Sequence, residues 1–183
     1  MEKQYSTKTK VHLYTVRTDE PESRLFFNDV FNRFASYVAS VALRLLGDES
    51  IVDDMVQDVF LDCYRKLDTL QSMEHARRWL VKVTVRKASK RLHRNKMMRL
   101  LRLADASSLE LSIPVVTAEQ RSELALLYRL LDRLPVPVRL AWSMRYLEGA
   151  QISDVAFACG CSVATAKRRI RAAQETLLGV THE

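Results

Sequence analysis

A cluster of cations lies near the carboxyl end of the chain: Lys167, Arg168, Arg169 and Arg171. They fall on one side of a segment whose apolar residues recur at spacings of four, three and four, which is the period of an amphipathic helix. These apolar residues are Ala166, Ile170, Ala173 and Leu177. Cationic side chains on a helix face bind phosphate and read base edges without any covalent chemistry. The pattern predicts a DNA-binding helix; the alternative is an ordinary solvated basic face.

The residues just before this segment complete a helix-turn-helix pattern. A short helix is predicted over 152–159, with Ala156 small enough for a second helix to approach closely. Gly160 can take the positive φ of a tight turn, and Ser162 stands where an N-cap belongs. Such motifs place the second helix in the major groove, so Ser162 and Thr165 join the cations as candidate DNA contacts.

A second basic group follows His75, since the residues from His75 to Arg102 include eleven Lys or Arg and no acid. Trp79 and two apolar residues anchor the start of a predicted helix, and the apolar stripe gives out past Val85. Lys82, Arg86, Lys90 and Arg94 line one face, with Lys87 and Arg91 beside them. Buried unpaired cations are prohibitive, so this face must meet solvent or phosphate. Trp79 either packs in the core or stacks on unpaired bases.

An acidic strip marks the helix predicted before that one. From Asp29 to Glu74 there are nine acidic and four basic residues, a balance opposite to that of the following segment. The strip consists of Asp54, Gln57, Asp58 and Asp62, on the side opposite a core stripe of Val52, Met55, Val56, Val59, Phe60, Cys63 and Leu67. It is either a solvated face or a docking surface for a protein partner.

Composition limits the function classes. With 48% hydrophobic residues but only 4 Gly and 4 Pro, the 183-residue chain is predicted to be all-α, and its net charge of +7 favours a polyanionic partner. Three cysteines are too few for a disulfide framework or a zinc site made of cysteines alone. We expect no catalytic residue, no metal and no cofactor, because the four histidines are scattered and no glycine-rich phosphate loop occurs. No signal peptide or membrane span is predicted, so we expect a cytoplasmic protein without membrane insertion.

The predicted organisation is two small helical domains joined by a flexible linker. A polar tail covers residues 1–23, the first domain 24–102, the linker 103–120 and the second domain 121–179. In the first domain a helix from about Leu25 ends at Gly47, and Asp48 or Ser50 caps the next one. In the second domain, Pro135 and Pro137 are expected to stop one helix before another at 138–147.

The order of these segments resembles the bacterial extracytoplasmic-function (ECF) sigma factors of the sigma-70 family. The motifs that carry the resemblance are GDESIVDDMVQDVFLDCYRKL at 47–67, ARRWLVKVTVRKASKRL at 76–92 and LPVPVRLAWSMRYLEGAQISDVAFACGCSVATAKRRIRAA at 134–173. The resemblance covers roughly residues 25 to 178, apart from the linker. The first and third motifs are the more specific, because a Leu-Pro start, a Leu-Glu-Gly run and a helix-turn-helix occur in the family's order and spacing.

The resemblance implies a role for each surface. The acidic strip would dock on core RNA polymerase, the region around Leu70 to Arg94 would bind and help melt the −10 promoter element, and the helix-turn-helix would read the −35 element. Anti-sigma factors often hold members of this family inactive, which makes such a protein a further candidate partner. The alternative is a stand-alone helix-turn-helix regulator that does not join polymerase, which would leave the acidic strip and the Trp79 helix without a role.

Overall fold

The computed structural model describes residues 21–70, 72–102 and 118–180, and within these ranges the regular elements are helices with no strand. They are α1 (Pro21–Leu46), α2 (Val52–Arg65), α3 (Met73–Arg102), α4 (Ala118–Arg133), α5 (Val136–Tyr146), α6 (Ile152–Ala158) and α7 (Val163–Val180), with 3-10 turns η1 (Glu49–Ile51) and η2 (Leu67–Thr69). The all-α class expected from the sequence is confirmed. Most of the expected tail and linker lies outside the described residues. Among the helices described, none is both long and apolar enough to cross a bilayer.

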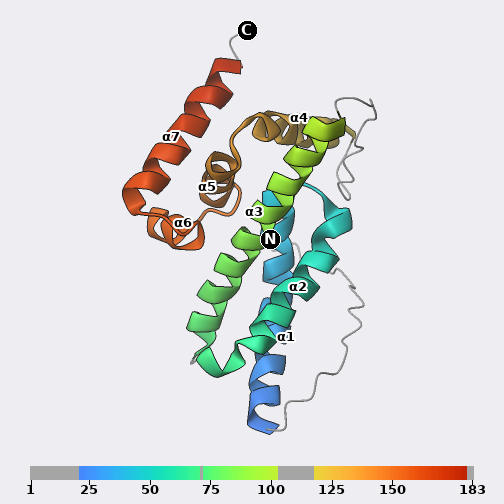
Figure 1. Cartoon of the computed structure of the whole chain (residues 1–183), viewed down its shortest axis with the longest axis vertical. Helices are drawn as coiled ribbons and strands as arrows, with labels where there is room; N and C mark the ends of the chain where they lie inside the picture. The colour runs from blue at the N-terminus through green and yellow to red at the C-terminus, as the bar shows by residue number, and fades with distance from the viewer. Residues whose placement is uncertain (1–20, 71, 103–117, 181–183) are drawn as a thin grey trace.

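Helices α1, α2 and α3 form a bundle, with α1 and α3 packed side by side (Figure 1). The apolar residues of α1 recur at spacings of three and four, so they share one face that the neighbouring helices cover. Val38, Val41 and Leu45 on this face are each 1% exposed. The whole predicted core stripe is buried, from Val52 of α2 to Leu67 of η2, including Val59 and Cys63. Burying such aliphatic side chains stabilises the bundle by about 1.5–3 kcal/mol each.

The ends of these helices follow from their capping residues. Gly47 has φ +74° and its N–H donates to the Leu43 carbonyl at 2.7 Å, which terminates α1. The Asp48 carboxylate accepts from the Ser50 N–H at 3.0 Å, so Asp48 is the cap of the following turn. Helix α3 begins two residues earlier than predicted because the Ser72 hydroxyl accepts from the His75 N–H at 3.1 Å.

The apolar side of α3 continues past Val85, contrary to expectation. Ala88 is fully buried and Leu92 is 8% exposed, so the helix keeps an inward face beyond the point where its sequence becomes strongly basic. The pattern is easy to miss because Ala88 is small and the two residues are separated by cations. The expected basic face is present on the other side of the same helix, so only the predicted end of the apolar stripe was wrong.

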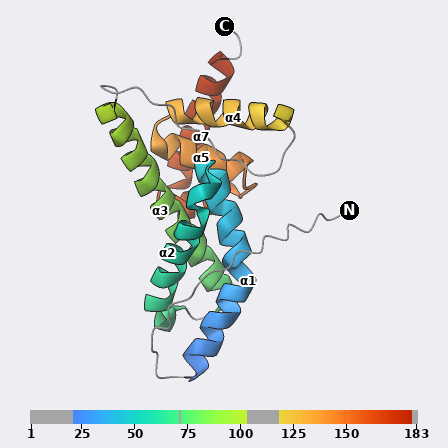
Figure 2. The same ribbon diagram turned by 90° about the vertical axis from the view of Figure 1, so that its right-hand side faces the viewer.

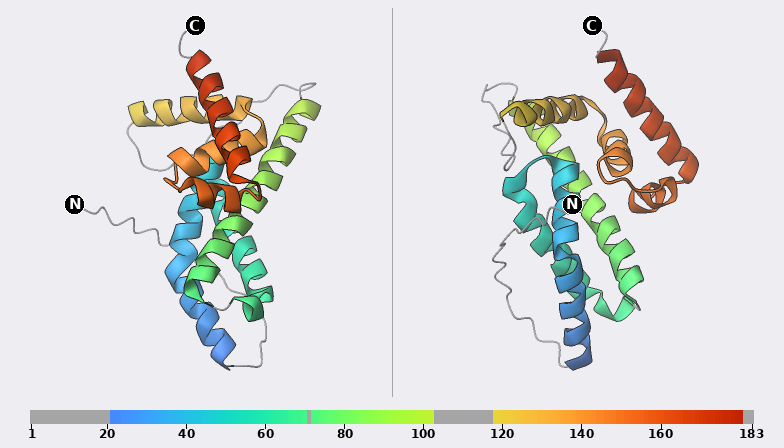
Figure 3. Two further views of the ribbon diagram at one scale, coloured as in Figure 1. Left: turned by 90° about the vertical axis from the view of Figure 1, so that its left-hand side faces the viewer. Right: turned by 180° about the vertical axis from the view of Figure 1, so that it is seen from behind.

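The second half of the chain begins with α4, which lies across the ends of the α1–α3 bundle (Figure 2). This helix starts three residues inside the segment predicted as linker. Helix α5 starts at Val136, two residues before the prediction, and therefore contains Pro137 in its first turn. Proline is tolerated there because the N–H groups of a first turn have no partner within the helix. Helix α7 stands at the outer side of this half, seen from behind in Figure 3.

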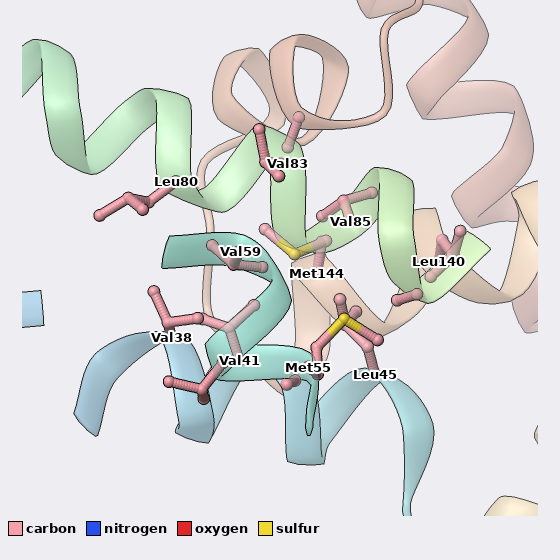
Figure 4. Packing of buried hydrophobic residues seen from close by; sticks show 14 of the residues in the cluster. Val38, Val41, Leu45, Met55, Val59, Leu80, Val83, Val85, Leu140 and Met144 are labelled. Carbon is pink, nitrogen blue, oxygen red and sulfur yellow. The ribbon is translucent and has the colours of Figure 1, made fainter. Parts of the chain in front are cut away.

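The two halves share a hydrophobic core. Leu140 and Met144 of α5 are buried in the same cluster as Leu45 of α1, Met55 of α2 and Val85 of α3 (Figure 4). Helix α6 also packs on α3. The second half therefore lies directly on the bundle.

Candidate nucleic-acid and protein-binding surfaces

The turn between α6 and α7 has the geometry of a helix-turn-helix. Gly160 has φ +61°, as the sequence predicted, and the Cys161 N–H reaches back to the Ala156 carbonyl at 2.9 Å. The Ser162 hydroxyl accepts from the Thr165 N–H at 3.1 Å and caps α7. Ala156 and Ala166 are both buried, so the two helices approach closely. The first turn of α7 is therefore held rigidly.

The candidate contacts on α7 divide by exposure. Lys167, Arg168 and Arg171 are exposed, as is Ser162, whereas Thr165 and Arg169 are half-buried. The Nε of Arg171 donates to the Glu175 carboxylate at 2.8 Å, one turn further along the exposed side. The free face of α7 thus carries Lys167 and Arg168 in its second turn and Arg171 at mid-helix. The amino end of a helix itself attracts phosphate. Arg169 differs from these three cations because it is half-buried and lines a cleft together with residues of α3.

The basic face of α3 is also present. Lys82, Arg86, Lys90 and Arg94 are exposed, while Lys87 and Arg91 are half-buried. The Arg86 guanidinium lies 3.3 Å from the Asp62 carboxylate of α2, so this cation is partly neutralised within the protein. Lys90 and Arg94 have open access to a polyanion, whereas the Lys82 nitrogen lies 4.9 Å from the centre of the Phe157 ring of α6.

Trp79 packs against the core, which is one of the two alternatives that the sequence left open; its stacking on an unpaired base stays a prediction. It is half-buried and packs against the hydrophobic core, yet it also lines an open cleft of about 720 Å³. Lys82 and Lys90 of α3 line the same cleft, and Gly160 and Arg169 of the helix-turn-helix line its other side. The cleft thus lies between the two basic elements of the molecule.

The acidic strip on α2 is narrower than predicted. Asp54, Gln57 and Asp58 are exposed on one face. Asp62 instead turns toward α3, where its carboxylate lies 3.0 Å from the Lys87 ammonium; its side chain is 24% exposed. At 3.6 residues per turn, position 62 is about 80° away from position 54 around the helix. The geometry favours a structural role for Asp62, in pairing α2 with α3.

Leu61 continues the strip in place of Asp62. It is 43% exposed, and its position falls within about 20° of Asp54 around the helix. The sequence reasoning missed this residue, although the spacing of four from Gln57 and three from Asp58 was available as a signal. An exposed leucine bordered by carboxylates can supply apolar contact area to a partner.

Arg139 and Tyr128 join the halves of the molecule and were not anticipated. Arg139 is 3% exposed; burial lowers the pKa of its guanidinium and the Asp132 carboxylate offsets that effect. Burial likewise raises the pKa of the Tyr128 hydroxyl. Nothing in the local sequence indicated that these residues join the halves, because both donate to backbone carbonyls of α1, about ninety residues away.

The three cysteines are free thiols. Burial raises the pKa of Cys63 to about 12 and that of Cys159 to about 11, so both are protonated and poorly nucleophilic near neutral pH. Across the described ranges, no group of three or more potential ligands is arranged to hold a metal ion.

Two segments of the chain match families that describe parts of sigma factors. Residues 30–97 match Sigma-70 region 2, which spans α1 to α3, and residues 124–177 match Sigma-70, region 4, which spans α4 to α7. Curated relatives include the ECF RNA polymerase sigma-E factor of Escherichia coli (strain K12), 27% identical over 168 residues with 82% of this chain and 84% of the relative covered. Another is the RNA polymerase sigma factor NccH of Alcaligenes xylosoxydans xylosoxydans, 29% identical over 157 residues with the same coverage.

Solved structures agree on the fold. The sigma factor RpoE of Bartonella quintana, in complex with the anti-sigma factor NepR, has a TM-score of 0.64 at 18% identity, covering 86% of this chain and 97% of that one. CnrH in complex with the cytosolic domain of CnrY has a TM-score of 0.58 at 24% identity, covering 87% and 89%. The chain belongs to the sigma-70 family, as an ECF-type RNA polymerase sigma factor.

Proposed function

We propose that this chain binds core RNA polymerase as a sigma subunit and directs it to promoters, with a separate surface for each partner. Members of the family are transcription initiation factors rather than enzymes, and a protein in this role works in the cytoplasm. The observation that carries the proposal is the exposed triplet Lys167, Arg168 and Arg171 on α7, behind a capped turn in the segment that matches region 4.

Helix α7 is the element that reads the −35 DNA. Its amino end enters the major groove, where Lys167 and Arg168 contact base edges or phosphates and Arg171 holds the backbone. Ser162 and Thr165 orient this end, because their hydroxyls lie 2.9 Å apart at the cap. Arg169 contacts DNA only after it leaves the cleft beside α3.

Helix α3 binds the DNA around the −10 element. Lys82, Lys90 and Arg94 hold phosphates along its exposed face, with Arg86 joining when it is released from Asp62. Trp79 lines the cleft, and an unpaired base stacks on its indole ring. Arg91 is half-buried and supports this face from its side.

The docking surface for core polymerase is the strip formed by Asp54, Gln57, Asp58 and Leu61. It presents two carboxylates, an amide and an apolar side chain along one face of α2, away from the basic surfaces. Charge opposite in sign to the DNA-binding faces keeps this surface from competing for DNA. An anti-sigma factor is a further proposed partner, since RpoE of Bartonella quintana is solved with one.

The test of the whole proposal is run-off transcription with purified core polymerase and a promoter library, with and without the protein. Transcripts that appear only with the protein establish the sigma role and report both promoter elements. A protein that shifts duplex DNA but neither binds core polymerase nor initiates is a stand-alone regulator instead.

The docking strip has its own test, the affinity for core polymerase. The double variant Asp54→Arg with Asp58→Arg should bind about tenfold more weakly or worse, because it places like charges at the interface. Asp29→Arg with Asp68→Arg is the matched control, since it makes the same charge change at exposed positions outside the strip. Asp62→Asn should leave the affinity unchanged. Equal losses in the two double variants would remove the strip from the interface.

A further inference from the structure

One carboxylate between α2 and α3 is shared by three cations. Oδ2 of Asp62 lies 3.0 Å from the Lys87 ammonium and 3.3 Å from Nη2 of Arg86, both on α3. Oδ1 of the same carboxylate lies 3.6 Å from Nη1 of Arg65, three residues further along α2. The Asp62 and Lys87 side chains are 24% and 20% exposed, whereas that of Arg86 is 59% exposed. Asp62 therefore holds an inner cation and an outer one.

The pair of Asp62 with Lys87 accounts for the packing of α2 on α3. A cation as shielded from water as Lys87 is costly without an acidic partner. Asp58 lies 3.9 Å from the same ammonium and adds to this pairing. Arg86 has no such need, because water reaches more than half of its side chain. The second contact of Asp62, with Arg86, is thus not required for packing, and its consequences belong to the surface.

This surface is the basic one proposed to meet DNA. Six Lys or Arg residues line the cleft beside α3, and among the described residues that line it Asp62 is the one carboxylate. A phosphate that binds Arg86 must replace the Asp62 carboxylate as its partner. The same phosphate also approaches a negative charge that α2 holds in place, and like charges at short distance repel. Asp62 therefore competes with DNA for Arg86.

We propose that Asp62 is a positioning residue that turns Arg86 away from DNA and so limits the non-specific DNA binding of the free protein. The inference rests on the proposed function, because it assumes that α3 meets phosphates. Non-specific binding comes from phosphate contacts, so withholding one cation weakens binding to every sequence alike. A protein with a net charge of +7 is attracted to all DNA, and this restraint leaves more of it available to core polymerase.

The salt dependence of binding to a duplex without a promoter tests the proposal in the full chain. Asp62→Asn should steepen the slope of log K against log salt by about 0.9, because Arg86 then contacts phosphate. Between 50 and 200 mM salt its affinity should accordingly fall about threefold more than that of wild type. Asp53→Asn is the matched control, since it makes the same charge change at an exposed position of α2 about 180° around the helix from Asp62. It should leave the slope unchanged.

A second variant guards against loss of folding and against an effect of net charge. Asp62→Asn with Lys87→Met removes both members of the inner pair, so no shielded ammonium is left without its partner and the net charge stays that of wild type. Arg86 still loses its carboxylate, and the slope should steepen by about 0.9 here as well.

Arg86→Gln separates positioning from packing. In the wild-type background it should leave the slope unchanged, because Asp62 already occupies the guanidinium. In the Asp62→Asn background it should flatten the slope by about 0.9, back to the wild-type value. A carboxylate that only stabilised the α2–α3 pair would change the free energy of unfolding and would leave the effect of Arg86→Gln the same in both backgrounds.

The same effect of Arg86→Gln in both backgrounds would overturn the proposal, as would equal steepening by Asp53→Asn. Failure of its premise gives a different result. Lys90→Ala with Arg94→Ala should flatten the wild-type slope by up to about 1.8 if α3 meets phosphates. No flattening in that variant would overturn the DNA-binding role of α3, whereas flattening there without any effect at position 62 would overturn only the role of Asp62.

Discussion

Arg139 shows how a single residue can organise an interface between distant segments. Its guanidinium remains charged because arginine keeps its proton even when burial lowers its pKa, and here Asp132 counteracts the shift. Its fork-shaped set of donors serves two carbonyls of α1 and one carboxylate at once. A lysine would bring the charge without the fork. The position therefore depends on the shape of the side chain as well as on its charge.

Gly47 and Gly149 offer a comparison of two glycines with similar backbones and different surroundings. Both have positive φ, +74° and +72°, but a Cβ on Gly47 would lie 2.5 Å from Cδ1 of Tyr128, whereas one on Gly149 would meet nothing within 4 Å. Gly149→Ala should lower the free energy of unfolding by about 1–2 kcal/mol through backbone strain alone. Gly47→Ala should cost about 1–3 kcal/mol more, because the Tyr128 ring must move.

Urea denaturation of both variants measures the difference, and the Tyr128→Ala background supplies the control. In that background Gly47→Ala should cost no more than Gly149→Ala. Equal losses in the wild-type background would contradict the close approach of Tyr128 to the end of α1.

At the scale of the helix, two substitutions of Ser162 distinguish an effect on stability from an effect on DNA binding. Ser162→Ala removes the acceptor for the Thr165 N–H and should lower the free energy of unfolding by about 1 kcal/mol. Ser162→Asp keeps an acceptor at the cap, so its stability should be close to that of wild type, but it places a carboxylate where α7 meets phosphate. Thermal unfolding and the affinity for duplex DNA check the two effects. Tight DNA binding by Ser162→Asp would mean that this end of α7 lies away from the backbone of the DNA.

The helices themselves were predictable because burial follows the helical period. The stripe from Val52 to Leu67 identified the inner face of α2 without any knowledge of its neighbours. Gly160 and Ser162 marked the turn of the helix-turn-helix, since a positive φ and a cap are local requirements. The start of α5 was predicted two residues too late because Pro137 was taken as a helix breaker. Proline ends a preceding helix, but it is also favoured in the first turn of the next one.

Contacts between distant segments were not predictable in this way. The sequence places Asp62 on the polar side of α2, but only the position of α3 decides that it meets Lys87 instead of solvent. The sequence alone does not distinguish Arg139 from the other arginines, because its burial depends on the end of α1 lying beside it. The shared core could not be predicted for the same reason. The apolar stripe of α5 shows that this face is buried, but it does not show which helices cover it.

At the scale of the whole molecule, the surface proposed for the protein partner is acidic and the surfaces proposed for DNA are basic. The exposed carboxylates of α2 and the exposed cations of α3 and α7 lie on different helices, so the surfaces proposed for polymerase and for DNA share no residue. The net charge of +7 adds a general attraction to DNA that does not depend on any one residue. A measurement of DNA binding must therefore distinguish contacts by named side chains from the overall field.

The salt dependence of duplex DNA binding makes that distinction. Each phosphate neutralised by a cation contributes about −0.9 to the slope of log K against log salt. The triple variant Lys167→Ala, Arg168→Ala and Arg171→Ala should therefore flatten the slope by up to about 2.7, if all three side chains contact phosphate. The matched control, Arg24→Ala, Arg33→Ala and Arg129→Ala, removes the same charge from exposed positions on α1 and α4 and should leave the slope nearly unchanged. Equal flattening in both would mean that the overall charge attracts DNA, and α7 would lose its assignment as the reading helix.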